Sequence, residues 1–349
     1  MAVPAAAPAK SKPPRVEARS WALIDAGSGE VLISHAAARR LPIASTTKLM
    51  TAWVVLHELP LGKIVRARRY HPTYGESLLG LRVGQRISVR DLLYGMVLRS
   101  GNDAAYNLAL AAAGSERRFV RQMNLRAAAL GLADTHYANP VGLDRRGNHS
   151  SARDLATLTR HLLQIPVFAK IADSRSAVLR SVRPRRRIAT INELLRMAPW
   201  VNGVKTGHTF GARYVLVGAG RRKGVELISA VVGAPTDEDR FTDDLRLLDY
   251  GFSRYPRPTP IRAGREIAIQ AVPLGAGPSI HRASAFGRVR GFIGDHAIPI
   301  GLGAFVILIC AAFLWRRRRR RTKGEGTIRV SCEERRAVGR QSGGGEDAQ

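Results

Sequence analysis

Apolar residues recur at helical spacing over several stretches between residues 45 and 163. One such stripe predicts a helix that begins near Ser45, since Pro42 disfavours helix in the residue before it. The members of this stripe are Leu49, Ala52, Trp53 and Leu56. Residues 88–91, Ser-Val-Arg-Asp, form a capping-box pattern that predicts the start of a second helix. Further helices are expected over residues 103–113, 116–130 and 151–163.

Runs typical of β-strands lie on both sides of this helical part. Five of them are rich in apolar residues and bounded by turn residues. They cover residues 20–25, 30–35, 201–209, 214–219 and 226–232. Shorter strands are expected over 64–70 and, with loops, over 171–188, and a helix over 237–250. Strands joined by hairpins pair antiparallel. We therefore predict a mixed α/β fold of the α+β type, with one antiparallel sheet assembled from distant parts and an inserted helical subdomain.

The composition limits the classes of partner and site. The 349 residues carry a formal net charge of +29, which favours anionic partners. No aromatic-studded basic motif accompanies the charge, so the sequence does not indicate nucleic-acid binding. The two cysteines, Cys310 and Cys332, lie near the C-terminus. The main body is therefore expected to lack a disulfide or a thiolate metal site.

The C-terminal part predicts attachment to a membrane. Residues 297–315 are nearly free of polar groups and are about long enough for a transmembrane helix. Arginines follow at once over 316–321, and the positive-inside rule makes 316–349 a basic cytoplasmic tail. We therefore expect a single-pass protein of the cell membrane, with the domain over residues 20–255 on the extracytoplasmic side.

Two other segments have the composition of a disordered N-terminal segment and of a linker. Residues 1–19 are rich in alanine, proline and lysine and are expected to be disordered. Residues 256–296 read as a short linker with enough chain for a few strands. The first 14 residues lack the apolar core of a signal peptide, so we expect a signal peptide to be encoded upstream.

Three short motifs carry residues suited to nucleophilic catalysis. Ser45 and Lys48 are three residues apart on a predicted helix, so they share a face, and the amine could take the proton of the hydroxyl. Ser100 and Asn102 lie where a helical run is interrupted. Residues 205–209, Lys-Thr-Gly-His-Thr, lie on a predicted strand, where the glycine would let a ligand approach the backbone. Taken alone, the first motif is more typical of a helix cap, the second of an ordinary helix interruption, and the third of a charge on an edge strand.

The order of the motifs is more specific than any one of them. S-x-x-K, then S-x-N, then K-T-G is the order of the penicillin-recognising active-site serine enzymes. With the flanking segments 44–51, 98–105, 139–143 and 203–209, the sequence resembles D-alanyl-D-alanine carboxypeptidases, the low-molecular-mass penicillin-binding proteins. The resemblance covers roughly residues 21–255. It implies an antiparallel sheet between helix layers, with the site in a cleft beside the helical subdomain.

The resemblance also implies an activity and the roles of four residues. The enzyme would remove the terminal D-alanine from peptidoglycan stem peptides through an acyl-enzyme, and β-lactams would acylate it. Ser45 would be the nucleophile and Lys48 its base, with a pKa lowered by desolvation and by Lys205. Ser100 would relay a proton to the leaving amine, and Asn102 would orient Lys48 and the substrate amide. No metal or cofactor is called for.

The third motif would recognise the end of the peptide. Lys205, Thr206 and Thr209 would hold the free C-terminal carboxylate. Gly207 would let the substrate backbone lie against the strand. The backbone N–H groups of His208 and of the nucleophile would form the oxyanion hole.

The sequence departs from the family pattern at two positions. Thr190 and Arg213 replace the asparagine and glycine that are usual at these positions, and both would alter the rim of the site.

Two alternative functions remain open from the sequence. A β-lactamase would need a fast deacylation base, yet no Glu-x-x-Leu-Asn pattern lies between Ser100 and Lys205. A non-catalytic sensor of β-lactams or wall fragments would signal through residues 316–349, which are short, basic and without domain character.

Overall fold

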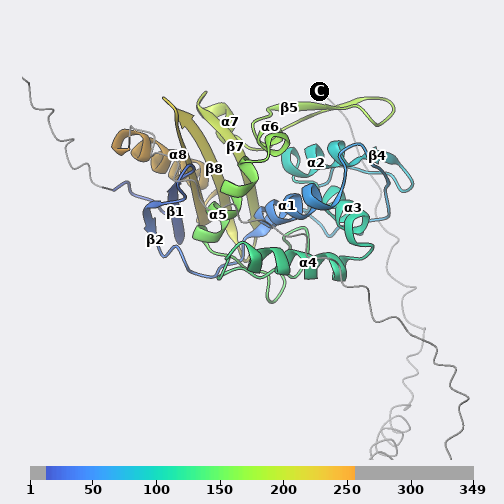
Figure 1. Ribbon diagram of the computed structural model, residues 1–349, viewed down its shortest axis with the longest axis horizontal. Coiled ribbons are helices and arrows are strands. Elements are labelled where there is room, and N and C mark those ends of the chain that lie inside the picture. The colour runs from blue at the N-terminus through green and yellow to red at the C-terminus, as the bar shows by residue number, and fades with distance from the viewer. Residues whose placement is uncertain (1–12, 256–349) are drawn as a thin grey trace, which may run out of the picture. The chain divides into compact units, whose positions relative to one another are not determined.

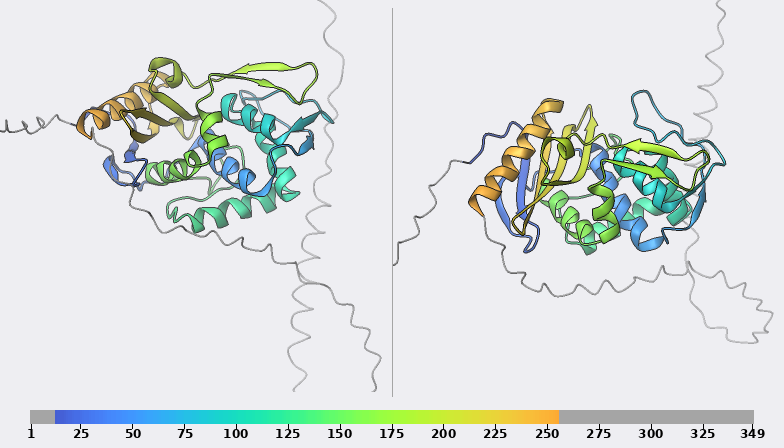
Figure 2. Two further views of the ribbon diagram at one scale, coloured as in Figure 1. Left: turned by 45° about the horizontal axis from the view of Figure 1, so that its top comes forward. Right: turned by 90° about the horizontal axis from the view of Figure 1, so that it is seen from above.

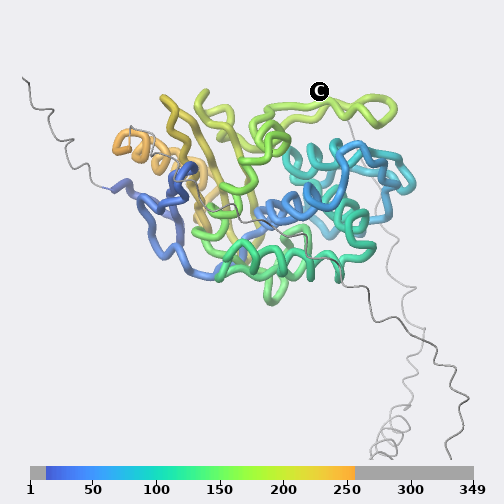
Figure 3. Tube along the Cα trace, viewed as in Figure 1, coloured from blue at the N-terminus to red at the C-terminus, as the bar shows by residue number. Residues whose placement is uncertain are grey.

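The computed structural model describes residues 13–255. Its central antiparallel sheet has five strands in the order β2-β1-β9-β8-β7. The strands are β1 Ser20–Asp25, β2 Val31–His35, β7 Val201–Thr209, β8 Arg213–Arg222 and β9 Val225–Ala234. Figure 3 shows the first two strands beside the last ones, although most of the chain separates them in sequence. The predicted antiparallel sheet from distant parts of the chain is confirmed.

Most of the elements between β2 and β7 form a largely helical subdomain beside the sheet (Figure 1). It contains a 3-10 turn, η1 Ala44–Thr47, which leads directly into α1. The helices of the described residues are α1 Lys48–Glu58, α2 Val89–Leu98, α3 Asn102–Ala113, α4 Glu116–Ala129, α5 Ala152–Leu163, α6 Pro166–Ala172, α7 Leu194–Met197 and α8 Asp237–Arg254. Two small hairpins pair β3 Ile64–Arg66 with β4 Arg86–Ser88, and β5 Ser176–Leu179 with β6 Arg186–Ala189.

Helices cover both faces of the central sheet, as Figure 2 shows with α8 on one side and α5 on the other. The alternation of side chains along β1 explains how both faces become apolar. Ala22 and Ile24 belong to the larger core that the sheet shares with the subdomain, whereas Trp21 and Leu23 pack under α8. The expectation of a sheet between helix layers is therefore confirmed.

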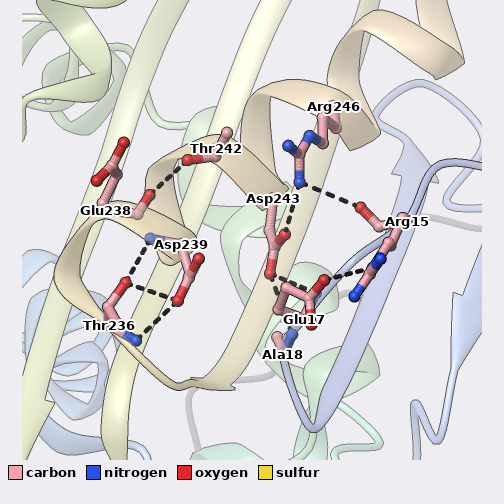
Figure 4. Close-up of polar contacts among 9 residues, drawn as sticks. All are labelled: Arg15, Glu17, Ala18, Thr236, Glu238, Asp239, Thr242, Asp243 and Arg246. Atoms are coloured by element: carbon pink, nitrogen blue, oxygen red, sulfur yellow. Dashed lines mark hydrogen bonds and ion pairs between the residues drawn. The ribbon is translucent and has the colours of Figure 1, made fainter.

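Side-chain caps fix the starts of the helices that flank the site. Ser88 accepts a hydrogen bond from the backbone N–H of Asp91, as the capping-box pattern predicted for α2. Helix α8 begins with a complete capping box, in which Thr236 and Asp239 each accept from the backbone N–H of the other (Figure 4). Such caps satisfy backbone donors that the first helical turn leaves free.

Two predicted elements differ from the structure. The strand expected over 64–70 ends at Arg66, because the side-chain oxygen of Asn107 takes the backbone N–H of Arg68 at 2.6 Å. The strands and loops expected over 171–188 are preceded by α6, which extends to Ala172. This helix has proline at its first turn, where a missing N–H costs no hydrogen bond.

The last residues of the N-terminal segment before β1 lie against α8. The backbone N–H groups of Glu17 and Ala18 donate to Asp243 Oδ2 at 2.9 and 3.0 Å (Figure 4). Ala18 is buried. The disorder expected over residues 1–19 is therefore wrong for the part nearest β1, and residues 1–12 lie outside the described residues.

No helix between residues 13 and 255 combines the length and apolar character that crossing a bilayer requires. The transmembrane segment predicted over 297–315 lies outside the described residues, as do the linker 256–296 and the tail 316–349. These three assignments stay predictions.

Candidate active site

Ser45 and Lys48 lie at the junction of η1 and α1. Lys48 Nζ is 2.8 Å from Ser45 Oγ. The lysine is buried, with 1% of its surface exposed, and the serine is half-buried. The amine also donates to the backbone carbonyl of Val141 at 2.5 Å. The three-residue spacing thus places the amine against the hydroxyl, as the sequence predicted.

One asparagine builds the turn that presents Val141. Asn139 Oδ1 accepts the backbone N–H groups of Val141 and Gly142 at 3.1 and 2.6 Å. Gly142 has a φ of +94°, and a Cβ there would lie 2.0 Å from the carbonyl oxygen of Ala44. Only glycine therefore lets this turn lie so close to the backbone of the nucleophile.

Ser100 lies in the break between α2 and α3 and has a φ of +56°. Its hydroxyl accepts a hydrogen bond from Lys205 Nζ of β7 at 3.0 Å, and the same amine donates to the carbonyl of Thr206 at 2.6 Å. Both Ser100 and Lys205 are buried. Left-handed backbone is uncommon outside glycine and clusters at functional sites. The helix break therefore brings a second hydroxyl to a second amine.

The two lysines share a desolvated environment. Burial lowers the pKa of Lys48 well below its ordinary value, and the charge of Lys205 lowers it further, against smaller opposite effects of Glu76 and Asp103. Burial, followed by the charge of Arg240, lowers the pKa of Lys205 to about 7. Lys48 is therefore available as a neutral amine, with the depressed pKa that a general base requires.

The third motif runs past the nucleophile on β7, the edge strand of the sheet. A Cβ at Gly207 would lie 3.0 Å from the backbone nitrogen of Ser45, so the glycine allows the strand to approach η1. Arg240 of α8 donates to the carbonyl of Gly207 at 3.0 Å. His208 is exposed at this end of the strand. The motif therefore lies where the sequence placed it, on a strand beside the serine.

Thr209 has a different contact from the one expected. Its hydroxyl donates to Asp144 Oδ1 at 2.8 Å, and the N–H of Gly211 donates to Asp144 Oδ2 at 2.9 Å. These bonds tie the end of β7 to the turn over residues 139–144. The hydroxyl that was expected to bind a substrate carboxylate is thus occupied by a carboxylate of the protein. Asp144 directly follows the flanking segment 139–143 in the sequence and belongs to none of the three motifs.

Asn102 also makes a contact that the sequence did not indicate. Its Nδ2 donates to Glu76 Oε2 at 2.7 Å, and the hydroxyl of Tyr70 donates to the same oxygen at 2.5 Å. Glu76 holds only the nitrogen of this amide, so the predicted role of Asn102 toward Lys48 stays a prediction. Glu76 lies between the first and the second motif in the sequence and belongs to neither.

These pairs form one site, because the charge of Lys205 acts on Lys48 and Gly207 lies against the backbone of Ser45. Among residues 13–255, no three or more His, Cys, Asp or Glu side chains are grouped to hold a metal ion. A serine hydroxyl against a desolvated amine, with a second amine beside an edge strand, is the arrangement of an activated nucleophile. The fold and the site define an active-site serine enzyme on a mixed α/β scaffold.

Comparisons with known proteins give the family. A family model described as D-alanyl-D-alanine carboxypeptidase matches residues 7–236. The D-alanyl-D-alanine carboxypeptidases DacF of Bacillus subtilis and DacC of Escherichia coli are 35% and 37% identical, over 68% and 75% of this chain. The solved structure of D-alanyl-D-alanine carboxypeptidase from Mycobacterium tuberculosis has a TM-score of 0.67 and 36% identity, and covers 72% of this chain and 97% of that one. The chain belongs to the D-alanyl-D-alanine carboxypeptidase family.

The match to the curated relatives does not extend over their whole length. The chain spans 63% of DacF and 68% of DacC. The family resemblance stated from the three motifs is confirmed, and so is the fold that it implied.

Proposed function

We propose that the protein is a serine-type D-Ala-D-Ala carboxypeptidase that removes the terminal D-alanine from peptidoglycan stem peptides and is acylated by penicillins. The observation that carries this proposal is the 2.8 Å separation between Lys48 Nζ and Ser45 Oγ, with the lysine buried. Membership of the family supports the substrate class, because the relatives are named for this activity.

Acylation begins when Ser45 Oγ attacks the carbonyl carbon of the D-Ala-D-Ala bond and its proton passes to the neutral amine of Lys48. The developing oxyanion is stabilised by backbone N–H groups of Ser45 and His208, a kind of interaction worth about 3–4 kcal/mol per donor. The amide C–N bond then breaks, and the leaving amine takes, through Ser100, the proton that Lys48 had accepted, so Lys48 is neutral again. Water hydrolyses the resulting ester and regenerates the serine.

Recognition of the peptide end depends on Lys205. Its ammonium pairs with the free C-terminal carboxylate, which explains why a cation lies on the edge strand beside the nucleophile. The pairing favours the charged amine and so raises a pKa that burial and Arg240 have lowered to about 7. Thr206 lies next to this amine and Gly207 gives the substrate backbone access to the strand. Thr209 supports the same end of β7 through Asp144.

The experiment is covalent labelling of the full-length chain with a fluorescent penicillin, followed by mass spectrometry of the labelled peptide. The label is expected on Ser45, and the unlabelled enzyme is expected to release D-alanine from a D-Ala-D-Ala peptide. Ser45→Ala should lose the label and reduce turnover by about 10⁴-fold or more. Ser253→Ala, which changes an exposed hydroxyl at the end of α8, is the matched control and should retain both activities.

The other outcomes select the alternative functions. Labelling without D-alanine release would replace the enzyme with a β-lactam or wall-fragment sensor. Rapid turnover of the penicillin itself would indicate a β-lactamase. Retention of the label in Ser45→Ala would contradict the assignment of the nucleophile.

We also propose that residues 297–315 anchor the protein in the cell membrane, with the catalytic part outside and residues 316–349 in the cytoplasm. The length and apolar character of the segment and the arginines that follow it support this orientation. A substrate in the cell wall requires a catalytic domain on that side.

A further inference from the structure

The loop between β3 and β4 is fastened to the second motif. The carboxylate of Asp103 accepts three consecutive backbone N–H groups of residues 79–81 at 2.7, 2.8 and 2.9 Å. The backbone N–H of Asn102 donates to the carbonyl of Ser77 at 2.8 Å. The loop is thus fixed on the first turn of α3, next to Ser100.

Glu76 lies in this loop with both carboxylate oxygens occupied. Oε1 accepts the backbone N–H and the hydroxyl of Thr73, each at 2.8 Å. Oε2 accepts the hydroxyl of Tyr70 at 2.5 Å and Nδ2 of Asn102 at 2.7 Å. Four donors surround one half-buried carboxylate and leave it a single position.

This carboxylate determines how the amide of Asn102 lies. A carboxylate only accepts hydrogen bonds, so the amide must present its nitrogen to Glu76 and its oxygen to the other side. That oxygen, Oδ1, is buried and has no hydrogen-bond partner within residues 13–255. Buried acceptors are normally satisfied. This open acceptor belongs to the second motif, two residues after Ser100 in the sequence, so a donor that arrives with the reaction could satisfy it.

We propose that Glu76 is a positioning residue for acylation: it holds Asn102 Nδ2 so that Oδ1 is turned toward the substrate N–H and the ammonium that forms on Lys48. This inference rests on the proposed function, since it concerns the same acylation. Neither the three motifs nor the roles assigned to them include Glu76.

The charge of Glu76 gives a second, independent signature. The charged groups that act on Lys48 are Lys205 on β7, Glu76 in the loop and Asp103 on α3. Burial and Lys205 lower the pKa of Lys48, whereas Glu76 and Asp103 raise it. Burial acts to raise the pKa of Glu76, but hydrogen bonds from Tyr70, Asn102 and Thr73 lower it, so the group is ionised at neutral pH. Loss of this charge therefore lowers the pKa of Lys48 further.

The test measures the acylation rate constant of the full-length chain with a fluorescent penicillin as a function of pH. Glu76→Ala is expected to slow acylation by up to about 100-fold, the cost of a misplacement of about 1 Å in an active site. The side chain of Glu76→Gln can still accept a hydrogen bond from the Asn102 amide or donate one to it, so the acylation rate should fall less in this variant. In both variants the acid limb of the rate profile should move to lower pH, because that limb reports deprotonation of Lys48.

Two controls separate positioning from folding. Tyr70→Phe removes one hydrogen bond from the same oxygen but leaves the charge and the bond to Asn102, so the acid limb should not move. Glu226→Ala breaks a second Glu–Asn pair, in which Asn202 Nδ2 donates at 2.7 Å and Asn202 Oδ1 is likewise buried without a partner in the described residues. That pair lies outside the site, and its loss should leave the acylation rate unchanged.

The outcomes are distinguishable. An unlabelled wild-type chain would overturn the proposed function and this inference with it. A labelled wild type with an unchanged rate in Glu76→Ala would overturn the inference alone. If Glu76→Ala does not fold, an unshifted acid limb in a folded Glu76→Gln variant contradicts the inference in the same way.

Discussion

At the scale of single residues, the site depends on two buried amines with different tasks. In the proposed mechanism Lys48 must be neutral to take the proton of Ser45, whereas Lys205 must be charged to hold a carboxylate. Burial disfavours the charged form of both, and their mutual repulsion adds to this effect at Lys48. Glu76 moderates the effect at Lys48 and also fixes Asn102. The sequence identified these residues, but it did not reveal the protonation state of each side chain.

The pKa of Lys205 predicts how activity depends on pH. A lysine is charged below its pKa, so the free enzyme loses its carboxylate-binding cation as the pH rises through about 7. We expect kcat/KM for D-alanine release to fall above this pH, since kcat/KM reports groups of the free enzyme. The limb in kcat should lie at higher pH, because the bound carboxylate favours the ammonium.

The measurement is the rate of D-alanine release from a D-Ala-D-Ala peptide between about pH 5 and pH 9, a range that spans the relevant titrations. Lys205→Arg keeps its charge throughout this range and should lose the alkaline limb in kcat/KM, whatever its absolute rate. A wild-type kcat/KM that does not fall above neutral pH would contradict the assignment of Lys205.

At the scale of elements, the site is formed by three short segments around η1. The turn over residues 139–143 and the edge strand β7 lie against η1, and the break between α2 and α3 meets β7 where Ser100 accepts from Lys205. Glycine makes two of these approaches possible, at Gly142 and Gly207. In the break between α2 and α3, the backbone of Ser100 has a left-handed conformation. Local sequence identified each segment, and the packing of β7 on η1 brought the first and third motifs together.

Gly142 offers a sharp test of this convergence. A Cβ at this position would lie 2.0 Å from the carbonyl oxygen of Ala44 and 2.9 Å from the backbone nitrogen of Ser45. Gly142→Ala must therefore displace the backbone of the nucleophile. We expect a loss of stability of about 1–3 kcal/mol and a clear loss of penicillin labelling.

The matched control for this variant is Gly147→Ala. Gly147 also has a positive φ, +87°, but a Cβ there would meet only His136 at 3.5 Å, an ordinary contact. It should cost stability by the same backbone effect while labelling of the folded protein remains normal. Equal labelling rates in the two folded variants would show that the turn does not support the nucleophile. Thermal unfolding and the labelling rate provide the two readouts.

At the scale of the whole molecule, the chain closes its sheet with strands from both ends of the described residues. Residues just before β1 bind Asp243 on α8, so the N-terminal segment and the last helix are held together (Figure 4). The helical subdomain is inserted between β2 and β7 and returns the chain to the sheet at the third motif. This arrangement places Lys205 opposite Ser100, which is 105 residues away in sequence.

The proposed membrane anchor leads to a prediction at the same scale. A chain that ends at residue 296 should move from the membrane fraction to the soluble fraction of cells, while its rate of penicillin labelling remains unchanged. A chain that lacks only residues 316–349 keeps the apolar segment and should stay with the membrane. The measurement is the distribution of the labelled protein between the two fractions. Retention of both truncated chains in the membrane would place the attachment elsewhere.

The sequence by itself determined most of the secondary structure over residues 13–255, and it determined the family. Periodic apolar positions, caps and glycines act through neighbouring residues, so they are readable locally. The order of S-x-x-K, S-x-N and K-T-G identified the nucleophile helix, the helix break and the strand. The exceptions include the strand that ends at Arg66, because the next N–H groups include that of Arg68, which is taken by Asn107, 39 residues away in the sequence.

Only the tertiary structure decided which side chains meet. Glu76 and Asp144 had no recognisable pattern, because their partners Asn102 and Thr209 are remote in sequence. The depressed pKa of Lys205 likewise arises from burial and from Arg240, a residue of another element. Hydrogen bonds between distant segments and desolvation are properties of packing, and packing is specified by the whole chain together.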